Sequence, residues 1–586
     1  MCSIIAYSGN KVAAPVLVNG LKRMEYRGYD SVGMATISNG KILVRKGVGK
    51  VDEVNKSLRL EKMDGKIGIG HTRWATHGGV TNANAHPHQC CGNDIAIVHN
   101  GIIDNYDELK KSLIAKGHKF KTETDSEVIA HLLGDFLSKN DDIKKAMIST
   151  TNKLKGTYAF VAVFDDGTVA GLRYDEPLIV GIAKDGYYIS SDVLGFIEHT
   201  DRAIFLDNRE IAIVDTNSLS IFNYDGSEVK RQVTQIAWEL ADADKGKFAH
   251  HTLKEINEQR HTIANALANR NHNIKEFCDA VSDAKRVVIT GSGSSYHAVL
   301  IAKQLFSKYA KIHCEAIISS EFQYASNLLG KDSVLIAISQ SGETADLLQA
   351  VKTARASKAK ILSIVNVPTS SLARASDLSL GMNCGPEIGV AATKSFTAQL
   401  GLIYKITSTL SGLNLGISQK DISKTINTLL NSMKNIVQIA DKIKHIGNIY
   451  LLGRGLHFPI ALEGALKLKE LVYVHAEGIP AGELKHGPLA LMDEKTIVIV
   501  LNPDDETYDD TLSNVHEIKA RGAGVIGISN INSNKYDDWI KIPKAKESLY
   551  PILEVIPLQL LAYHTALKRE SNPDYPRHLA KSVTVK

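Results

Sequence analysis

The sequence is poor in cysteine, in net charge and in long apolar runs, and each shortage excludes a class of protein. Its 586 residues include only six cysteines, too few for the disulfide framework of a secreted mini-domain. The net charge is +5, and no block of five or more Lys/Arg suggests a nucleic-acid or membrane surface. No stretch approaches the ~18 apolar residues of a membrane helix, and the opening MCSIIAYSGNK lacks the regions of a signal peptide. These shortages predict a cytoplasmic globular protein without nucleic-acid or membrane partners.

The stretch HPHQCC is the one segment with a metal-like composition. It contains His86, His88, Cys90 and Cys91. Its spacing does not match a structural zinc pattern, and adjacent cysteines rarely ligate one tetrahedral ion. We therefore expect no metal at this motif, and the sequence indicates no other cofactor.

The second half of the chain contains a repeat. KRVVITGSGSSYHAVLIAKQL and KHIGNIYLLGRGLHFPIALEGALKL follow the same pattern of strand, glycine turn and helix, with Gly291 matching Gly453. Two further phrases match at nearly the same offset, pairing Glu343 with Glu506 and Asn366 with Asn530. Strands that alternate with helices predict parallel sheets, so the repeat indicates a duplicated α/β domain.

The first copy carries a cluster of hydroxyl groups where the second carries carboxylates. Its residues at two adjacent helix starts are Ser294, Ser295, Ser339, Gln340, Ser341 and Thr344. Hydroxyls and free amides at a helix N-terminus suit a phosphate, whereas Asp504 and Asp505 of the second copy would repel one. Simple helix capping needs one such residue per helix, so the cluster favours a phosphoryl site in the first copy alone. A dinucleotide is disfavoured because Tyr296 replaces the third glycine of the fingerprint.

The second copy supplies titratable side chains instead. Glu463, Lys467 and Glu470 have i, i+4 and i, i+3 spacing and share one face of a predicted helix. Such a face is more often solvated than catalytic. The following AGELKHGPLAL places Lys485 and His486 in a turn between glycines, which is a better functional candidate.

The first half of the chain has a different pattern, and it begins with a cysteine. Strands such as GKIGIGH, DIAIVHN, GTYAFVAVF and REIAIVD predict paired antiparallel sheets with flanking helices. If Met1 is removed, Cys2 carries both a thiol and an α-amine, whose pKa values are close enough for proton exchange near neutral pH. Asn100 and the amide of Gly101 would stabilise a developing oxyanion.

Several motifs together resemble a known family. Cys2 with EYRGYDS, HTRWATHG, HNGIIDN and TETDSEVIAHL resembles the class II glutamine amidotransferase domain. ISQSGETAD, EIGVAATK, ALEGALKLKE, GELKHGPLAL and the ending LAKSVTVK resemble the paired sugar isomerase domains of the glutamine–fructose-6-phosphate aminotransferases. The resemblance runs from end to end. It implies an N-terminal αββα sandwich followed by two doubly wound parallel-sheet sugar isomerase (SIS) domains.

The resemblance implies the following boundaries and partners. The glutaminase domain would span 2–238, a linker 239–275, the first SIS domain 276–416, the second 440–576 and an active-site tail 577–586. The substrates would be L-glutamine and fructose 6-phosphate, the products L-glutamate and glucosamine 6-phosphate, and the protein a homodimer.

The resemblance also implies roles for the glutaminase residues. The Cys2 thiol would attack the glutamine amide, and the resulting thioester would hydrolyse. Arg73 would hold the glutamine α-carboxylate and Asp125 its α-ammonium group. Three further residues would complete this set: Thr76 and His77 would help to shape the pocket, and Trp74 would gate the passage of ammonia.

In the sugar site, the resemblance implies that Lys581 forms a Schiff base with open-chain fructose 6-phosphate. His486, reaching across from a partner subunit, would help to open the sugar ring. Glu470 would move a proton between C1 and C2 with Lys467 nearby, and the hydroxyl cluster of the first copy would hold the phosphate. The chain departs from the family at Ala392, where relatives often carry a serine.

Three other readings remain. Other enzymes with a Cys2 domain, amidophosphoribosyltransferase and asparagine synthetase, need a diphosphosugar loop or an SGGxDS-type loop that this sequence lacks. A sugar-phosphate sensor without turnover would have no reason to keep Cys2, Glu470, His486 and Lys581 together. An enzyme that degrades amino sugars would not need the Cys2 site, although the sequence excludes this reading less firmly.

Overall fold

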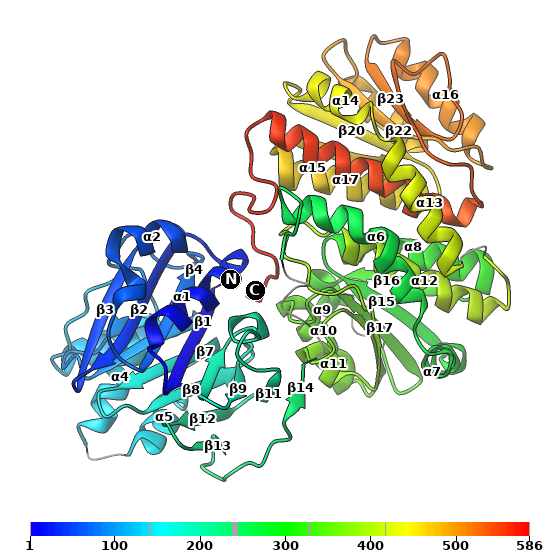
Figure 1. The fold of residues 1–586 in the computed structure, drawn as a ribbon. Helices are drawn as coiled ribbons and strands as arrows, with labels where there is room; N and C mark the ends of the chain where they lie inside the picture. Colours follow the sequence, from blue (N-terminus) through cyan, green and yellow to red (C-terminus); the bar gives the residue numbers. More distant parts are fainter. Residues whose placement is uncertain (1, 140–141, 237–243, 326–328, 416–417, 585–586) are drawn as a thin grey trace. The chain divides into compact units, whose positions relative to one another are not determined.

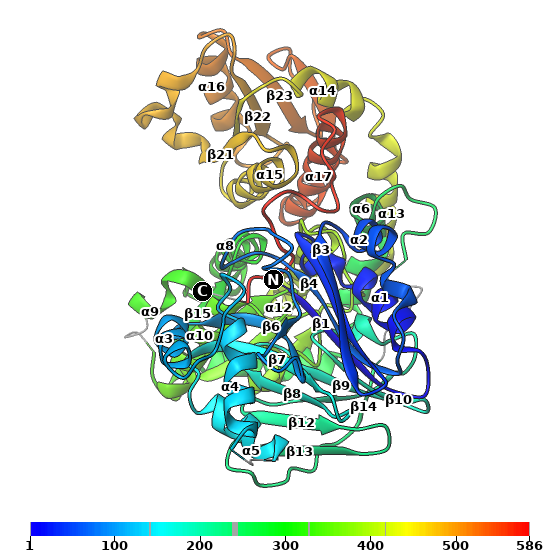
Figure 2. The same ribbon diagram turned by 90° about the vertical axis from the view of Figure 1, so that its left-hand side faces the viewer.

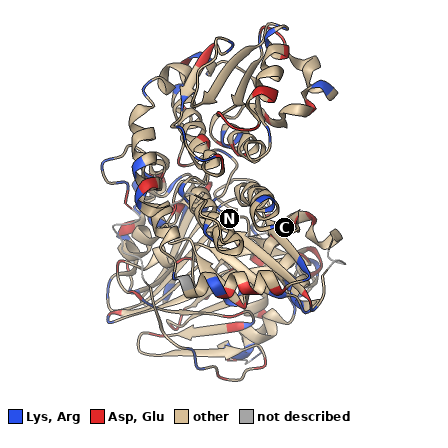
Figure 3. Cartoon of the chain, turned by 90° about the vertical axis from the view of Figure 1, so that its right-hand side faces the viewer, with Lys and Arg blue, Asp and Glu red and all other residues tan. Residues whose placement is uncertain are grey.

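The computed structural model describes residues 2–139, 142–236, 244–325, 329–415 and 418–584. The chain forms two compact units, which are described separately below. Unit 1 contains Met1–Asp242 together with Ala580–Lys586, and unit 2 contains Ala243–Leu579 (Figure 1). Lys and Arg are interspersed with Asp and Glu along the ribbon, in keeping with the small net charge (Figure 3).

Unit 1 is built from two antiparallel sheets. The first has the strand order β14-β11-β9-β10-β1-β4-β2-β3, and the second has the order β13-β12-β8-β7-β6-β5. The strands of the first sheet are β1 (Ser3–Gly9), β2 (Ser31–Ser38), β3 (Lys41–Val48), β4 (Ile67–Arg73), β9 (Ile179–Ala183), β10 (Gly186–Ser190), β11 (Arg202–Phe205) and β14 (Thr234–Gln235). Those of the second are β5 (His88–Gln89), β6 (Ile95–Ile103), β7 (Gly156–Phe164), β8 (Val169–Tyr174), β12 (Glu210–Val214) and β13 (Leu219–Asn223). The four strands predicted from sequence correspond to β4, β6, β7 and β12 and are confirmed.

Helices cover both outer faces of these sheets, so the predicted αββα sandwich is confirmed. Helices α1 (Ala13–Arg23) and α2 (Val51–Leu58) accompany the first sheet, and α3 (Tyr106–Ala115), α4 (Glu127–Leu137) and α5 (Ile143–Thr151) the second (Figure 2). Apolar side chains of alternating strand positions, such as Ile4, Ile69, Val98 and Val161, fill the space between the two sheets. A second core packs α4 and α5 against the outer face of β6 and β7.

Unit 2 contains the two copies of the repeat, each with a five-stranded parallel sheet. The first sheet has the order β16-β15-β17-β18-β19 and the second β21-β20-β22-β23-β24, so the two copies share one topology and the predicted duplication is confirmed. The first set comprises β15 (Arg286–Gly291), β16 (Cys314–Ile318), β17 (Ser333–Ser339), β18 (Lys360–Val365) and β19 (Leu378–Gly381). The second comprises β20 (Asn448–Gly453), β21 (His475–Pro480), β22 (Ile497–Leu501), β23 (Gly524–Ser529) and β24 (Asp538–Lys541).

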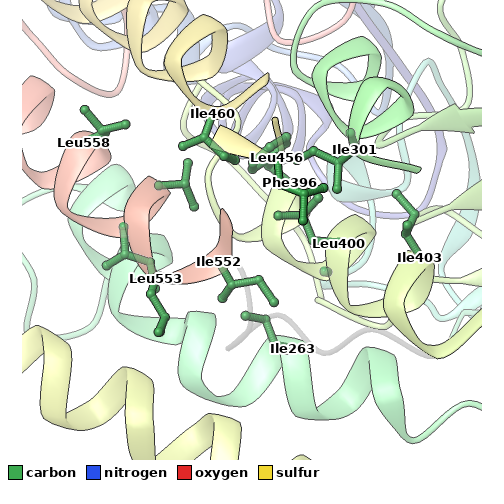
Figure 4. Close-up of a cluster of buried hydrophobic side chains, with 14 of the residues drawn as sticks. Ile263, Ile301, Phe396, Leu400, Ile403, Leu456, Ile460, Ile552, Leu553 and Leu558 are labelled. Atoms are coloured by element: carbon green, nitrogen blue, oxygen red, sulfur yellow. The ribbon is translucent and has the colours of Figure 1, made fainter. Parts of the chain in front are cut away.

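One apolar core unites the helices of both copies. The helices around the two sheets are α6 (His251–Leu267), α7 (Asn271–Asp283), α8 (Ser294–Leu305), α9 (Phe322–Ala325), α10 (Ala345–Ala356), α11 (Ser371–Ala375), α12 (Lys394–Ser411), α13 (Gln419–Ser432), α14 (Ile436–Ile443), α15 (His457–Val472), α16 (Tyr508–Lys519) and α17 (Tyr550–Lys568). Figure 4 shows Ile263 of α6, Phe396 of α12, Ile460 of α15 and Ile552 of α17 converging in this core. The two copies therefore pack as one body.

The segment predicted as a linker contains helix α6. Its Ile256 and Ile263 are fully buried in the core of unit 2, and the Gln259 side-chain amide donates to Gln559 Oε1 of α17 at 2.8 Å. The Asp574 carboxylate accepts hydrogen bonds from the amides of His251 and Thr252 at the start of α6. This part of the segment thus belongs to the packed structure of unit 2. None of the helices in the described ranges combines the length and hydropathy that crossing a bilayer requires.

Candidate active sites

The first site is built around Cys2, at the edge where β1 meets β4. The register pairs Ser3 with Thr72, which brings Cys2 to the end of β4. The Trp74 amide donates to Cys2 Sγ at 3.3 Å, and Sγ lies 3.5 Å from the Trp74 carbonyl oxygen. Burial raises the pKa of the Cys2 thiol, while the hydrogen bond from Trp74 opposes that rise. The thiol therefore depends on a neighbouring base to become a nucleophile.

Asn100, predicted to bind the oxyanion, is held in a defined orientation beside Cys2. Its Nδ2 donates to the Cys2 carbonyl oxygen at 3.1 Å, and its Oδ1 lies 3.2 Å from His71 Nε2. His71 Nε2 is also 3.0 Å from the carbonyl oxygen of His99, so this nitrogen faces two acceptors and carries the proton. Burial lowers the pKa of His71 to about 3, which keeps the ring neutral. His71 thus directs the Asn100 amide nitrogen toward Cys2.

Gly101 adopts a conformation that only glycine tolerates at this place. Its φ is +110°, and a Cβ there would lie 2.0 Å from the carbonyl oxygen of Thr157 on the paired strand β7. This backbone conformation sets the direction of the Gly101 amide, which adjoins Asn100 in the chain.

Arg73 and Asp125 are both buried in unit 1. The Arg73 guanidinium donates to the carbonyl oxygens of His77, Gly78 and Gly79, so it fixes the loop that follows β4. Burial lowers the pKa of Arg73, and the nearby Cys2 and Asp125 oppose this shift.

Asp125 accepts hydrogen bonds from the Ile103 amide at 2.8 Å and from the Ser126 hydroxyl at 3.3 Å. Thr76 is exposed, Trp74 is half-buried, and the half-buried His77 ring packs edge-on against Tyr106 at 4.5 Å. The structure therefore brings Cys2, Trp74 and Asn100 into contact, and it places Arg73 within electrostatic reach of both Cys2 and Asp125.

The second site lies at the carboxyl ends of β15 and β17. These neighbouring parallel strands end at Gly291 and Ser339, and α8 and α10 begin just after them, at the switch point of the sheet. Ser339 Oγ accepts the Gly342 amide at 3.0 Å and Ser341 Oγ accepts the Glu343 amide at 3.2 Å, which shapes the loop. Thr344 is the N-cap residue of α10, yet its side chain makes no capping hydrogen bond. Its hydroxyl is therefore not consumed by its own helix.

The predicted charged face of α15, in the second copy, reaches the start of α8 in the first copy. Ser294 Oγ donates to Glu463 Oε1 at 2.9 Å, and Lys467 Nζ donates to Ser294 Oγ at 3.3 Å. Lys467 also pairs with Glu470 at 2.5 Å and with Glu463 at 3.5 Å, confirming the shared face. His297 Nδ1 lies 2.7 Å from Glu463 Oε2.

This face is buried rather than solvated. The side chains of Glu463 and Lys467 are 0% exposed, whereas Glu470 is 21% exposed. Burial alone would lower the pKa of Lys467, but Glu470 and Glu463 raise it above its ordinary value. Burial would likewise raise the pKa of Glu463, but Lys467 and His297 lower it. Both groups are ionised at neutral pH, and Glu470 is the member of the set that solvent or a ligand can reach.

In the second copy, the position equivalent to the phosphate loops is filled by a buried network of one histidine and two carboxylates. His457 occupies the position of Ser295, and its ring lies 2.7 Å from Asp505 and 2.9 Å from Glu554. Burial alone would lower the pKa of His457, but Glu554 and Asp505 raise it to about 10. Asp505 also accepts the Thr507 amide at 2.8 Å, ahead of α16. The Asp505 carboxylate thus accepts the kind of backbone amide that binds an anion at other helix starts.

His486 and Lys581 lie on other parts of the chain. His486 is exposed and ends the 3₁₀ turn Ala481–His486, which also contains the exposed Glu483 and Lys485. Lys485 pairs with Glu517 at 2.9 Å. Lys581 is half-buried and belongs to the tail that groups with unit 1.

Three residues that orient the side chains or loops of the second site were not predicted from the sequence. His297 orients Glu463, and Gln399 Nε2 donates to Ser295 Oγ at 3.1 Å. The buried Glu387 accepts hydrogen bonds from the Thr393 amide and from the amide and hydroxyl of Ser395. Glu387 opens the EIGVAATK motif, so its place in a matched motif was the available signal.

Comparison with known families and proteins accords with both halves of the chain. The SIS domain model matches residues 280–407 and 442–569, and the glutamine amidotransferase domain model matches residues 71–196. The glutamine–fructose-6-phosphate aminotransferase (isomerizing) of Pyrococcus horikoshii is 44% identical over 100% of both chains. That of Aquifex aeolicus is 43% identical, again over the whole of both chains.

Solved structures resemble unit 2. The C-terminal domain of glucosamine-fructose-6-phosphate aminotransferase from Francisella tularensis has a TM-score of 0.52 and 36% identity, and it covers 56% of this chain and 99% of its own. A tagatose-6-phosphate ketose/aldose isomerase from Escherichia coli has a TM-score of 0.50 at 19% identity, over 56% of this chain and 95% of its own. The latter similarity concerns the fold alone.

Proposed function

Because the chain belongs to the glutamine–fructose-6-phosphate aminotransferase (isomerizing) family, we propose that it converts fructose 6-phosphate and L-glutamine to glucosamine 6-phosphate and L-glutamate. Glutamine hydrolysis consumes one water, and condensation of ammonia with the sugar ketone releases one, so the overall transfer is balanced. This reaction is the first step toward amino-sugar nucleotides.

In the glutaminase half, Cys2 acts as the nucleophile with the α-amine that removal of Met1 exposes as its base. The thiol adds to the side-chain amide, ammonia leaves, and water hydrolyses the glutamyl thioester to glutamate. Asn100 and the Gly101 amide stabilise the oxyanion, a role supported by the His71 contact that orients Asn100. Arg73 and Asp125 bind the α-carboxylate and α-ammonium of glutamine, Thr76 and His77 complete the pocket, and Trp74 gates the ammonia.

In the sugar half, the loops at β15 and β17 bind the phosphate: Ser294, Ser295, Ser339, Gln340, Ser341 and Thr344. His486 of a partner subunit assists ring opening, and Lys581 then forms a Schiff base with the open-chain C2 ketone, which releases one water. Ammonia adds to this imine and displaces the Lys581 amine, so the nitrogen from glutamine remains on C2. Glu470 then carries a proton from C1 to C2, which converts the ketose skeleton to the amino aldose. The buried Lys467 pairs with the Glu470 carboxylate at 2.5 Å and fixes its position.

One observation carries the sugar half of this proposal. Lys467 of the second copy contacts both Glu470 and Ser294, so the proton-transfer carboxylate is tied to the phosphate loop of the first copy. A reacting carbon bound through its distal phosphate would then lie near a fixed base. The internal His457 network supports phosphate binding in the first copy only.

We further propose a cytoplasmic homodimer that requires no metal or dissociable cofactor for turnover and binds neither nucleic acid nor membrane. The dimer follows from the role of His486, which is exposed on its own chain.

An endpoint assay with both substrates tests the proposal. Glutamate and glucosamine 6-phosphate should form in equal amounts from glutamine and fructose 6-phosphate. Glutamate without amino sugar would indicate that the ammonia is transferred to another acceptor, and Ala392 would then be the first residue to test. Neither product, from folded protein whose mass shows that Met1 is removed, would favour the sensor reading instead.

A further inference from the structure

A cluster of nitrogen and sulfur ligands lies in unit 1, away from the residues assigned to glutamine. Cys91 follows β5, His118 lies in the segment between α3 and α4, and His131 is on α4. Cys91 Sγ is 4.0 Å from His118 Nδ1 and 3.7 Å from His131 Nδ1, and the two Nδ1 atoms are 3.2 Å apart. Of the HPHQCC motif, only Cys91 takes part.

These separations are those of ligands that share one tetrahedral ion. With Zn–N near 2.05 Å, Zn–S near 2.3 Å and tetrahedral angles, two nitrogens lie about 3.3 Å apart and nitrogen and sulfur about 3.6 Å. The observed values differ from these by only a few tenths of an ångström. The exposed Cys91 leaves solvent access for a fourth ligand.

The far side of each imidazole faces a carboxylate. His131 Nε2 lies 3.5 Å from Glu127 Oε1, and His118 Nε2 lies 4.0 Å from Asp135 Oδ1. These carboxylates place negative charge on the Nε2 side of each ring, which favours a proton there and leaves the Nδ1 lone pair for a metal.

We propose that Cys91, His118 and His131 bind one zinc ion, with water as the fourth ligand. A thiolate with two imidazoles is a borderline-soft donor set that suits Zn²⁺ and excludes Mg²⁺ and Ca²⁺. On binding, the Cys91 thiol loses its proton to solvent, and no redox change is involved.

The ion would join three chain segments around α4. Helix α4 starts at Glu127, two residues after Asp125, so the site braces the element that presents Asp125. Its role is structural, because none of the three ligands contacts Cys2, Arg73 or Asp125 in the hydrogen bonds of the described residues.

Cobalt titration of the metal-free full-length protein tests the proposal without using activity. We expect one Co²⁺ per chain, with a thiolate-to-cobalt charge-transfer band and the intense visible absorption of tetrahedral Co²⁺, both removed by one equivalent of Zn²⁺. Cys91→Ser should abolish the charge-transfer band, and His118→Ala should weaken binding at least tenfold. Both side chains lie near the surface, which favours folding of the variants.

Two control variants exclude other sites. Cys2→Ala is needed because an N-terminal cysteine can chelate metal by itself, and His313→Ala alters an exposed histidine outside the cluster. Both variants should keep the full cobalt spectrum. Zn²⁺ should also raise the melting temperature of the wild type but not of Cys91→Ser. A charge-transfer band that survives Cys91→Ser, or that Cys2→Ala removes, would overturn the proposal. So would the absence of any tetrahedral spectrum in the wild type.

Discussion

Replacing Lys467 with methionine should destabilise unit 2 by an amount that its burial sets. The substitution keeps the length and most of the volume of the side chain but removes an ammonium group that is 0% exposed. Glu463, also 0% exposed, would lose the Lys467 ammonium at 3.5 Å and keep Ser294 and His297 as partners. Glu470, at 21% exposure, can regain hydration, so most of the cost falls on Glu463.

Removing one partner of a buried ion pair typically costs about 3–5 kcal/mol. For a unit as large as Ala243–Leu579 each kcal/mol lowers the melting temperature by about 1–2 °C, so the transition of unit 2 should fall by on the order of 5 °C. Thermal unfolding followed by circular dichroism, repeated in urea, measures the change. Lys469→Met is the matched control, since Lys469 lies on the same helix but is exposed, and it should shift stability by no more than about 0.5 kcal/mol.

A double variant separates charge from packing. Adding Glu463→Gln to Lys467→Met removes the stranded carboxylate and should recover about 1 kcal/mol or more, a non-additive result for two contacting residues. If Lys467→Met is no less stable than Lys469→Met, or if the double variant is the sum of the single ones, the ion pair is not the source of the stability.

Four further outcomes are expected. Cys2→Ala should abolish glutamine hydrolysis and leave isomerisation of fructose 6-phosphate; loss of both activities in a folded variant would contradict two separate sites. Lys581→Ala should stop amino-sugar formation while slow glutaminase activity remains, and normal glucosamine 6-phosphate output would remove Lys581 from the mechanism. Gly101→Ala should reduce glutaminase kcat by about 100-fold or more, because its Cβ would meet the Thr157 carbonyl oxygen at 2.0 Å; unchanged kcat would exclude Gly101 from the oxyanion site. The pKa of His457 is raised from 6.5 to about 10, so the stability that its charged form contributes is complete below pH 6.5 and is lost as the pH rises toward 10. The melting temperature should therefore fall more steeply between pH 7 and 10 in the wild type than in His457→Gln. Parallel curves for the two proteins would disprove this linkage.

Most of the fold could be predicted from periodic patterns in the sequence. The alternating strands of the first half and the matched phrases of the second half predicted both architectures, because burial on one face imposes a regular spacing. The spacing of Glu463, Lys467 and Glu470 likewise predicted a shared helix face.

The same spacing could not tell a solvated face from a buried one. That difference depends on Ser294 and His297, which approach from a helix more than 160 positions away in the sequence. Contacts of this kind arise from tertiary packing and leave no periodic trace. The meeting of Cys91 with His131, 40 positions apart, is another example, and so is the contact of His71 with Asn100.

The closed network of the second copy also limits how the duplicated domain could change. Restoring a phosphate site there would require removing Asp505, yet that step alone strands a protonated His457 against Glu554 in the interior. Removing His457 first leaves two buried carboxylates facing each other. Each single step passes through a destabilised protein, so the two halves of the repeat cannot exchange roles one substitution at a time. The buried network of His457, Asp505 and Glu554 therefore keeps the phosphate site in the first copy, independently of any requirement of catalysis.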